Sequence, residues 1–267
     1  MDPVVSVIMP VYEDWEYVDE ALTSLFNQTF PHWECIVIDD GSRGTDVERF
    51  IEKYKNDTRI RFEKRLHQGL PAARNAGILL ARGKYLQFLD ADDKLENEKL
   101  ERQIQFLETS PELDIIYGDV KYFGDKRKNG PKEVTSVLNS NILLKTLVHG
   151  NIAPVNCFLM RRLLTERGLL FDEVLPSYED WDFWLRAARM NARFFYLKET
   201  FASSCVRLRK GSMICDKKNM LKGRIEVRKK INAEVESQQL LVTNRTLMIL
   251  DCMRLIKAHV APVAVLQ

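Results

Sequence analysis

The sequence predicts an α/β protein in which a mostly parallel sheet is flanked by helices and followed by a helical C-terminal extension. Apolar runs of strand length alternate with segments of helical periodicity through about the first 110 residues, and this alternation is typical of a parallel sheet. Three of the apolar runs end in polar and acidic residues, at the edge where such sheets bind ligands. After residue 216 the chain becomes basic and helical in pattern.

The first two strand and helix units are the clearest. Residues 4–12 (VVSVIMPVY) are an apolar run interrupted by Pro10, and residues 14–30 carry apolar side chains at helical spacing. Residues 33–42 (WECIVIDDGS) repeat the strand pattern, and residues 45–55 repeat the helical one. We therefore expect two successive strand and helix units at the N-terminus.

The same pattern continues with less regularity. The further expected elements are strands over 59–64, 84–90, 114–123 and 156–160 and helices over 70–81 and 95–109. Residues 124–134 are expected to form a charged loop that contains Gly and Pro. Residues 222–230 are strongly basic, and residues 238–259 are amphipathic. We expect a domain over 1–215 and an extension over 216–267.

Composition excludes several classes of protein. Forty basic and thirty-eight acidic residues among 267 give a formal charge of +2, so no general affinity for nucleic acid is expected. The N-terminal residues are too acidic, and their apolar part too short, for a signal peptide. No uncharged apolar run approaches the ~20 residues of a membrane span. The scattered cysteines, Cys35, Cys157, Cys205, Cys215 and Cys252, suggest reduced thiols in the cytoplasm.

The stretch LDADD places three carboxylates, Asp90, Asp92 and Asp93, directly after an apolar run. Clustered carboxylates raise one another's pKa unless a cation lies among them, and a hard divalent cation shared with phosphates is the obvious candidate. A solvated acidic turn is the alternative. Because the turns PVYE and DDGS are expected at the same sheet edge, a binding site there is favoured over that alternative.

Taken together and in order, the segments PVYE, NQTF, IVIDDGS, AARNAGI, ARGKY, FLDADD and YEDWDFWLR resemble a family 2 glycosyltransferase with the Rossmann-like GT-A fold. The resemblance covers about residues 3–210. It implies the transfer of a sugar, with inversion, from a nucleoside diphosphate donor, usually UDP-linked, to an acceptor hydroxyl. Processive relatives carry a QxxRW motif and membrane spans, which this sequence lacks. Addition of a single sugar, in bacterial surface polysaccharide or glycolipid synthesis, is therefore expected.

The resemblance also assigns the donor site. The half 1–110 is expected to bind the nucleotide sugar, and the half 111–215 the acceptor, with specificity in the loop 124–134. Asp40 resembles the residue that bonds uracil, whose imide proton a carboxylate can accept; a helix cap is the alternative. Arg74 resembles a donor-contacting residue, since a guanidinium suits phosphate; a surface arginine is the alternative. The donor-binding residues implied are Pro10, Val11, Tyr12, Glu13, Asp40, Arg74 and Asp92.

LDADD resembles the DxD motif of the family, which implies a Mg²⁺ or Mn²⁺ ion. Asp93 would ligate the metal between the two phosphates, Asp92 would approach the donor sugar or share the metal, and Asp90 would support them. Which of the three touches the ion is open by one position. Many relatives hold the metal or the diphosphate with a late His. Arg209 stands at that place here, and it can pair with phosphate but cannot ligate a metal.

Glu179 and Asp180 resemble the ED motif of the family, whose Asp is the general base. Inversion in one displacement needs a single base on the face opposite the leaving group. Asp180 is assigned this role, and Glu179 is the competing acid. Two acids in the first turn of a helix, favoured by the helix dipole, are the alternative without chemistry.

Other functions explain fewer residues. A phosphatase with an aspartyl nucleophile accounts for LDADD but leaves YEDWD unexplained, and a dinucleotide dehydrogenase would need a GxGxxG after the first strand. A non-catalytic nucleotide-sugar-binding subunit, or a partner subunit, is the remaining alternative. The expected partners are a nucleotide sugar and a carbohydrate or lipid-linked acceptor. The basic, amphipathic extension suggests peripheral contact with the inner face of the membrane or a homodimer.

Overall fold

The structure, a computed structural model, describes residues 2–44, 46–124, 130–132 and 140–260. The strands are β1 (Val5–Val11), β2 (Trp33–Asp39), β3 (Ile60–Lys64), β4 (Tyr85–Phe88), β5 (Lys94–Leu95), β6 (Ile115–Tyr117), β7 (Val120–Phe123), β8 (Gly130–Lys132), β9 (Phe158–Arg161), β10 (Phe194–Tyr196) and β11 (Ser204–Arg207). The α-helices are α1 (Trp15–Phe26), α2 (Asp46–Tyr54), α3 (Leu70–Leu80), α4 (Lys99–Thr109), α5 (Ser140–His149), α6 (Leu163–Glu166), α7 (Glu179–Arg189), α8 (Lys217–Glu234) and α9 (Gln238–Val260). The 3-10 turns are η1 (Val155–Cys157), η2 (Thr200–Ala202) and η3 (Met213–Cys215).

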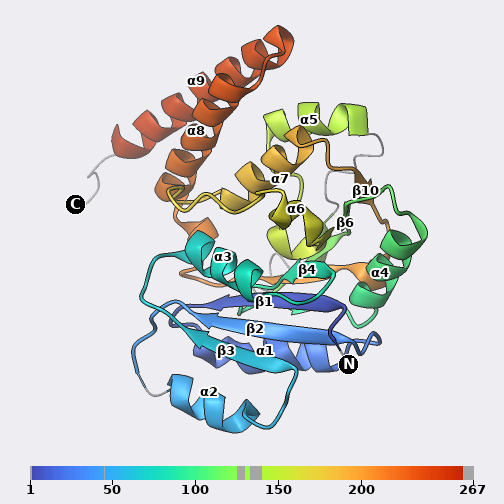
Figure 1. The fold of residues 1–267 in the computed structure, drawn as a ribbon. Helices are drawn as coiled ribbons and strands as arrows, with labels where there is room; N and C mark the ends of the chain where they lie inside the picture. The colour runs from blue at the N-terminus through green and yellow to red at the C-terminus, as the bar shows by residue number, and fades with distance from the viewer. Residues whose placement is uncertain (1, 45, 125–129, 133–139, 261–267) are drawn as a thin grey trace, which may run out of the picture.

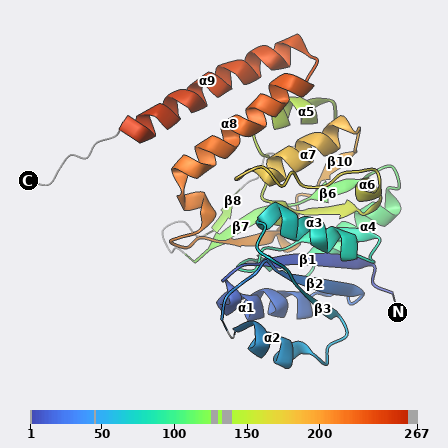
Figure 2. The same ribbon diagram turned by 60° about the vertical axis from the view of Figure 1, so that its left-hand side comes forward.

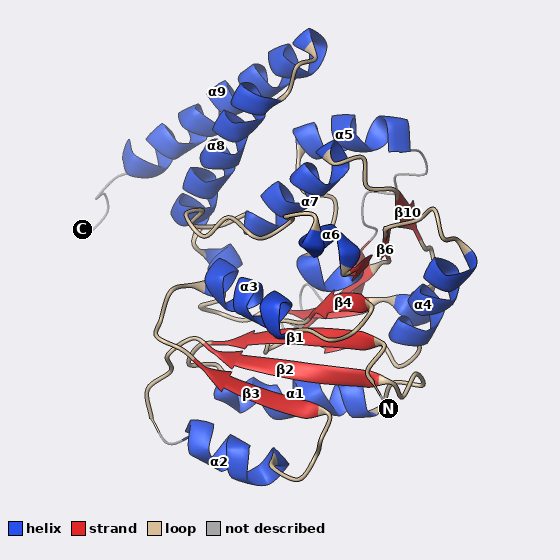
Figure 3. Ribbon diagram, viewed as in Figure 1, coloured by secondary structure: helices blue, strands red, loops and turns tan. Residues whose placement is uncertain are grey.

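The central strands pair in parallel, as the alternation of strands and helices predicted. The main sheet has the order β10-β6-β9-β4-β1-β2-β3, and β1 pairs in parallel with both β2 and β4. Strand β9 runs antiparallel to β4 and β6, so the sheet is mixed toward one edge. A small sheet has the order β5-β11-β7-β8. Figure 3 shows the strands as a central layer with helices around them.

Two large apolar cores, one on each face of the main sheet, hold the helices in place, and a small third cluster joins Ile36 and Ile38 of β2 to Ala73 of α3. Along β1 the side chains alternate, so Val7 joins the core with α1 and α4, whereas Ile8 joins the core with α3 and α7. All residues of β1 are buried, which explains why this run is apolar without alternation. Helices therefore cover both faces of the sheet (Figure 1).

The segment 114–123 differs from the expectation of one strand. It divides into β6 in the main sheet and β7 in the small one. Gly118 lies between them, where a Cβ would lie 2.8 Å from the carbonyl oxygen of Ala202. Only glycine lets the chain approach η2 this closely. The loop expected over 124–134 falls largely on 125–129 and 133–134, which lie outside the described residues.

The C-terminal extension begins as a hairpin of two helices, α8 and α9, that contacts α5 (Figure 2). Arg228 of α8 donates to Asp251 of α9 at 2.8 Å and to the carbonyl oxygen of Val148 in α5 at 3.1 Å. Gly223 lets α8 lie directly on Ser177, because a Cβ at this position would lie 2.0 Å from the Ser177 Oγ. Among the helices of the described residues, none combines the length and apolar character that a membrane crossing requires.

Candidate active site

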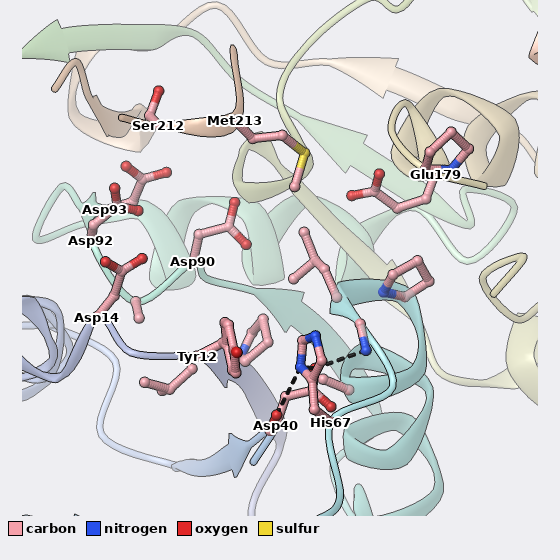
Figure 4. A pocket seen from close by; sticks show the side chains of 18 of the residues that line it. Tyr12, Asp14, Asp40, His67, Asp90, Asp92, Asp93, Glu179, Ser212 and Met213 are labelled. Atoms are coloured by element: carbon pink, nitrogen blue, oxygen red, sulfur yellow. Dashed lines mark hydrogen bonds and ion pairs between the residues drawn. The ribbon is translucent and has the colours of Figure 1, made fainter. Parts of the chain in front are cut away.

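A cavity of about 720 Å³ opens at the carboxyl ends of β1, β2 and β4. Its wall is formed by the turn after β1, the loop before α3, the acidic loop after β4, the start of α7 and the loop between β11 and η3. Segments far apart in the sequence therefore meet at the edge where open α/β sheets bind ligands. Figure 4 shows the cavity, and the lining residues used below are Tyr12, Asp14, Asp40, His67, Asp90, Asp92, Asp93, Glu179 and Arg209.

An aromatic pair forms one part of the wall. The rings of Tyr12 and His67 are stacked, with their centroids 4.1 Å apart and their planes inclined by 25°. Tyr12 is 43% exposed, so much of its surface is accessible from the cavity. The Nδ1 of His67 lies 2.8 Å from Oδ2 of Asp40, a contact drawn in Figure 4. Aromatic side chains beside a polar group suit the stacking of a nucleobase.

Asp40 is buried, and both of its carboxylate oxygens accept backbone hydrogen bonds. Oδ1 accepts from the N–H of Gln68 at 3.0 Å, and Oδ2 accepts from the N–H of Gly69 at 2.8 Å. Gly69 has a φ of +96°, a conformation that favours glycine. Asp40 therefore shapes the loop that presents His67, and its contact with a base stays a prediction.

The turn after β1 is shared between the cavity and the scaffold. Residues 10–12 line the cavity. Glu13, with a φ of 61°, is engaged elsewhere, since its N–H donates to the Ser42 Oγ at 2.9 Å. This bond ties the turn after β1 to the turn after β2. The reversal of the chain at Glu13 brings Asp14 to the cavity, a residue that the sequence analysis did not single out.

Four carboxylates gather beside the cavity: Asp14, Asp90, Asp92 and Asp93. Figure 4 shows Asp14, Asp92 and Asp93 on one side of the cavity, with Asp90 nearer its centre. Asp93 is only 4% exposed. Burial, and then the charges of Asp90 and Asp92, raise the pKa of Asp93 well above its usual value. The repulsion that the sequence predicted for LDADD is therefore present in the folded chain.

Asp93 is held by the chain on both of its oxygens. Oδ1 accepts a hydrogen bond from the N–H of Arg207 at 2.7 Å, and Oδ2 accepts one from the side-chain amide of Asn156. The Oδ1 of Asn156 in turn accepts from the N–H of Asp90 at 3.2 Å. Asn156 is fully buried, so it fixes the position of the acidic loop against η1.

Arg209 places its guanidinium among these acids from the loop after β11. Its Nε donates to Asp92 at 2.9 Å, and its Nη2 donates to Asp14 at 2.5 Å. The side chain is 25% exposed, and its guanidinium lies 5.0 Å from the ring centroid of Tyr17. Burial raises the pKa of Asp14, although the charge of Arg209 opposes that effect. Arg209 thus supplies a cation to Asp92 and Asp14 in the acid cluster.

The acid cluster supplies part of a ligand set for the divalent metal that the sequence implied. The described residues contain no group of three or more His, Cys, Asp or Glu side chains that could hold a metal ion. Asp92 and Asp93 nevertheless offer the oxygen ligands that Mg²⁺ and Mn²⁺ prefer. Mg²⁺ commonly takes one or two carboxylates and completes its shell with substrate phosphates and water. The residues therefore fit a metal that arrives with a diphosphate, and not a preformed cage.

A second group of acids lies at the first turn of α7. Glu179 lines the cavity, and its Oε1 accepts from the Nη1 of Arg74 at 2.6 Å. The Nη2 of the same guanidinium donates to Asp90 at 2.7 Å. Arg74 is 1% exposed and is not among the residues that line the cavity. It joins the two groups of acids through the protein interior, and its contact with the donor stays a prediction.

Asp180 follows Glu179 but is not among the residues that line the cavity. Its Oδ2 accepts from the amide of Asn151 at 2.8 Å, and its Oδ1 accepts from the N–H of Trp181 at 2.7 Å. Burial, and then the charge of Glu179, raise the pKa of Asp180 to about 7. A carboxylate of this proton affinity suits general-base catalysis near neutral pH. Position thus favours Glu179, whereas proton affinity favours Asp180.

Four residues of this site were not predicted from the sequence: Asp14, His67, Asn151 and Asn156. Asp14 directly follows the PVYE turn, so an acidic residue at the same sheet edge was an available signal. His67 and the two asparagines lie outside every motif, and only the folded contacts with Asp40, Asp180 and Asp93 reveal them.

Comparisons with known proteins agree with the fold and identify the family. The model for glycosyl transferase family 2 matches residues 6–169. An uncharacterized glycosyltransferase of Haemophilus influenzae is 34% identical over 216 residues, which cover 80% of this chain and 83% of that protein.

Two solved structures are similar in fold. Staphylococcus aureus TarS, in complex with UDP-GlcNAc, superposes with a TM-score of 0.70 and 24% identity, covering 90% of this chain and 70% of that one. The mannosyltransferase PcManGT from Pyrobaculum calidifontis, in complex with GDP-Man and Mn²⁺, gives a TM-score of 0.67 and 15% identity, covering 99% and 77% of the two chains. The fold class expected from the sequence is confirmed.

Proposed function

The chain belongs to glycosyl transferase family 2, and from that premise we propose that it transfers one sugar, with inversion, from a UDP-linked donor to an acceptor hydroxyl. Family membership makes the chain a transferase enzyme. The observation that supports the finer statement is that one cavity brings together an aromatic pair, a cluster of four acids and Glu179 of α7, which Asp180 directly follows in the chain. A nucleobase can stack on the aromatic pair, a diphosphate can bind the acid cluster through a divalent ion, and an acceptor hydroxyl needs an acid that takes its proton.

The donor half of the proposal depends on residues 1–110. Tyr12 and His67 would hold the base, Asp40 would hold His67 in place, and Asp92 and Asp93 would face the diphosphate. TarS and PcManGT, whose structures contain UDP-GlcNAc and GDP-Man, show that this fold accepts either base. We choose UDP because the IDDGS segment around Asp40 resembles the uracil-binding segment of the family.

A divalent ion fits the same half of the site. When bound, Mg²⁺ or Mn²⁺ would offset the negative charge that develops on the leaving diphosphate. Asp93 and Asp92 would hold the ion together with the phosphate oxygens. Arg209 lies within reach of the same place and can pair with phosphate once it leaves Asp92 and Asp14.

The acceptor half, residues 111–215, would supply the general base. Asp180 takes the proton of the acceptor hydroxyl, the acceptor oxygen forms a bond to the anomeric carbon, and the bond from that carbon to the phosphate oxygen breaks. Its electron pair leaves with the nucleoside diphosphate, so one displacement inverts the anomeric centre. Asp180 is favoured over Glu179 because Glu179 is bound to Arg74 at 2.6 Å, whereas burial raises the pKa of Asp180.

We further propose that the domain 1–215 carries catalysis and that the acceptor is a carbohydrate or lipid-linked intermediate of bacterial surface polysaccharide or glycolipid synthesis. Acceptor selection is assigned to residues 111–215. The reaction is placed in the cytoplasm, where the five free cysteines would stay reduced.

A donor screen tests this function directly. Thermal unfolding is measured with UDP-glucose, UDP-GlcNAc and GDP-mannose, each with and without Mn²⁺, because a ligand that binds only the folded state raises the melting temperature. The expected result is stabilisation by a UDP sugar, enhanced by Mn²⁺, and UDP release in the presence of acceptor. Stabilisation without UDP release under any acceptor would favour a non-catalytic binding subunit. Stabilisation by GDP-mannose alone would contradict the choice of UDP.

A further inference from the structure

Helix α9 exposes an apolar stripe on the face turned away from the rest of the protein. The stripe is formed by Val242, Ile249, Leu250, Met253 and Ile256, which are 64%, 57%, 43%, 56% and 62% exposed. These positions recur at helical spacing, so they share one side of the helix. Figures 1 and 2 show α9 on the outside of the hairpin, with α8 between it and the site.

The inner face of α9 is fixed by polar contacts, which prevents the helix from rotating to hide the stripe. Asp251 is 1% exposed and accepts from Arg228 at 2.8 Å. Asn244 is fully buried and donates to the carbonyl oxygen of Arg228 at 2.8 Å. A rotation that buried the stripe would separate Asp251 and Asn244 from Arg228. The buried charge of Asp251 would then lose its partner, which is costly. The apolar face is therefore held outward by the fold.

Most surface helices show the opposite pattern. Helix α4, for example, buries Leu100 and Leu107 and exposes charged residues such as Glu101 and Arg102. An exposed apolar face of several large side chains instead marks a surface that another body covers. The question is which body covers it.

The charges around the stripe point to an anionic surface. Arg245 and Lys257 of this helix are exposed. Arg254 is exposed too, but it pairs with Asp251 at 3.1 Å, and Asp251, the single acid of the helix, is buried. Two copies joined through this stripe would bring these like charges toward each other, which is unfavourable. A bilayer with anionic headgroups offers both an apolar layer for the stripe and a negative charge for the cations.

We propose that the outer face of α9 docks on an anionic lipid surface. The stripe enters the headgroup boundary, and Arg245 and Lys257 contact the anionic headgroups. The hairpin also connects this face to the site, because Arg224 of α8 donates to the hydroxyl of Tyr178 at 2.8 Å, next to Glu179. Docking would therefore hold the cavity at a set place relative to the lipid, whatever sugar is transferred.

Flotation of the full chain with vesicles tests the proposal. The vesicles are pure phosphatidylcholine or phosphatidylcholine with about 30% phosphatidylglycerol, at low salt, where surface charges are least screened. The chain is expected to float with the anionic vesicles and not with the neutral ones. The variant Val242→Ser/Ile249→Ser/Met253→Ser/Ile256→Ser should lose most of the bound fraction. The variant Arg245→Glu/Lys257→Glu should bind at least about tenfold more weakly, since each cation near such a surface contributes on the order of a fivefold change.

A matched control removes exposed apolar side chains elsewhere. Leu79→Ser/Phe201→Ser changes residues that are 78% and 62% exposed on α3 and η2, and it should float like the unaltered chain. Melting temperatures confirm that each variant is folded. Sedimentation velocity of the same samples reports the oligomeric state.

Four outcomes would overturn the proposal. A dimer that the stripe variant abolishes, without vesicle binding, would show that a second copy covers the stripe. A folded monomer that floats with neither kind of vesicle would show that the stripe does not bind lipid. Equal flotation with neutral vesicles would remove the role of the cations, and unchanged flotation of the stripe variant would place the lipid contact elsewhere.

Discussion

The acid cluster after β4 and the acid pair at the start of α7 both place carboxylates against arginine, but the two arginines differ. Arg209 reaches the cluster from a surface loop, and its side chain is 25% exposed. Arg74 lies between Asp90 and Glu179, and its side chain is 2% exposed. An exposed ion pair exchanges partners at small cost, whereas separation of a buried pair is expensive. The cluster is thus suited to exchange its cation for a metal, and the pair is suited to keep a fixed charge balance while a proton moves.

The largest expected effect tests the acid pair. Asp180→Asn keeps the size of the side chain and much of its hydrogen bonding but cannot accept a proton. General-base catalysis is typically worth ~10²- to 10⁴-fold, so kcat should fall by that order while donor affinity changes little. Steady-state kinetics and donor titration measure the two quantities separately.

Glu179→Gln is the matched control for that experiment. It should cost far less than Asp180→Asn if Glu179 serves mainly to balance Arg74. A crippling Glu179→Gln with a mild Asp180→Asn would show that the acid at the cavity wall is the base. Mild effects of both substitutions would show that the general base does not lie on α7.

The pH dependence sharpens the same assignment. A general base acts in its ionised form, and burial with the charge of Glu179 raises the pKa of Asp180 to about 7. The value of kcat/KM should therefore fall as the pH drops through about 7, well above the range of an ordinary carboxyl group. Asp180→Asn should remove this acidic limb from the residual rate. A limb near pH 4 in the unaltered enzyme would contradict the assignment.

Replacement of Arg74 tests whether the two groups of acids depend on one buried cation. Arg74→Met leaves Asp90 and Glu179 without their shared partner. Loss of one partner of a buried ion pair typically costs ~3–5 kcal/mol, and urea unfolding should show a loss toward the lower end because Asp90 is partly exposed. Arg209→Met, at the more accessible of the two arginines, should cost less than about 1 kcal/mol. Equal losses would erase the distinction between the two arginines.

Metal dependence tests the acid cluster. Mn²⁺ should strengthen donor binding, EDTA should lower turnover, and Asp93→Ala should lose the Mn²⁺ enhancement. Even residues that only support a metal ligand change affinity ~10- to 100-fold, so removal of a ligand should have at least that effect. Calorimetric titration of UDP with and without Mn²⁺ measures it. If EDTA leaves turnover unchanged, Arg209 and not a metal would offset the charge of the diphosphate.

The smallest effect is expected at Arg209. Arg209→Ala frees Asp92 and Asp14 from their partner, so Mn²⁺ should bind the free enzyme a few-fold more tightly, in line with the ~0.2–1 kcal/mol of an exposed pair. UDP should bind more weakly to the same variant, because a phosphate partner is lost. Electron paramagnetic resonance of Mn²⁺ reports the first quantity without turnover. Weaker Mn²⁺ binding would instead show that Arg209 organises the cluster.

The sequence predicted the parts of the fold that are buried on both sides. Strands β1 and β2 are buried along their whole length, so their composition alone marks them. Strand β11 was missed because it is short and partly exposed, and its pairing with β5 and β7 comes from distant segments. The division of 114–123 was missed because it depends on the approach of η2 to Gly118.

At the site, sequence motifs located residues but not the contacts of their side chains. Asp92 and Asp93 were placed at the cavity because strand ends share one edge of the sheet. Arg74 contacts Asp90 and Glu179, which lie 16 and 105 residues away in the chain. No local pattern could therefore reveal that the guanidinium of Arg74 is enclosed. The place of Asp180 beside Asn151 has the same origin.

The close contact between Gly223 and Ser177 restricts how this chain can be recombined with its relatives. A methyl group on residue 223 would lie 2.6 Å from the backbone carbonyl oxygen of Ser177, and backbone atoms cannot move aside as a flexible side chain can. Ser177 lies two residues before Glu179, so any shift there would reach the acid pair. A chimera that grafts a foreign helical hairpin onto residues 1–215 therefore has to keep a glycine at position 223. One missing methyl group sets the register in which α8 can be joined to the rest of the chain.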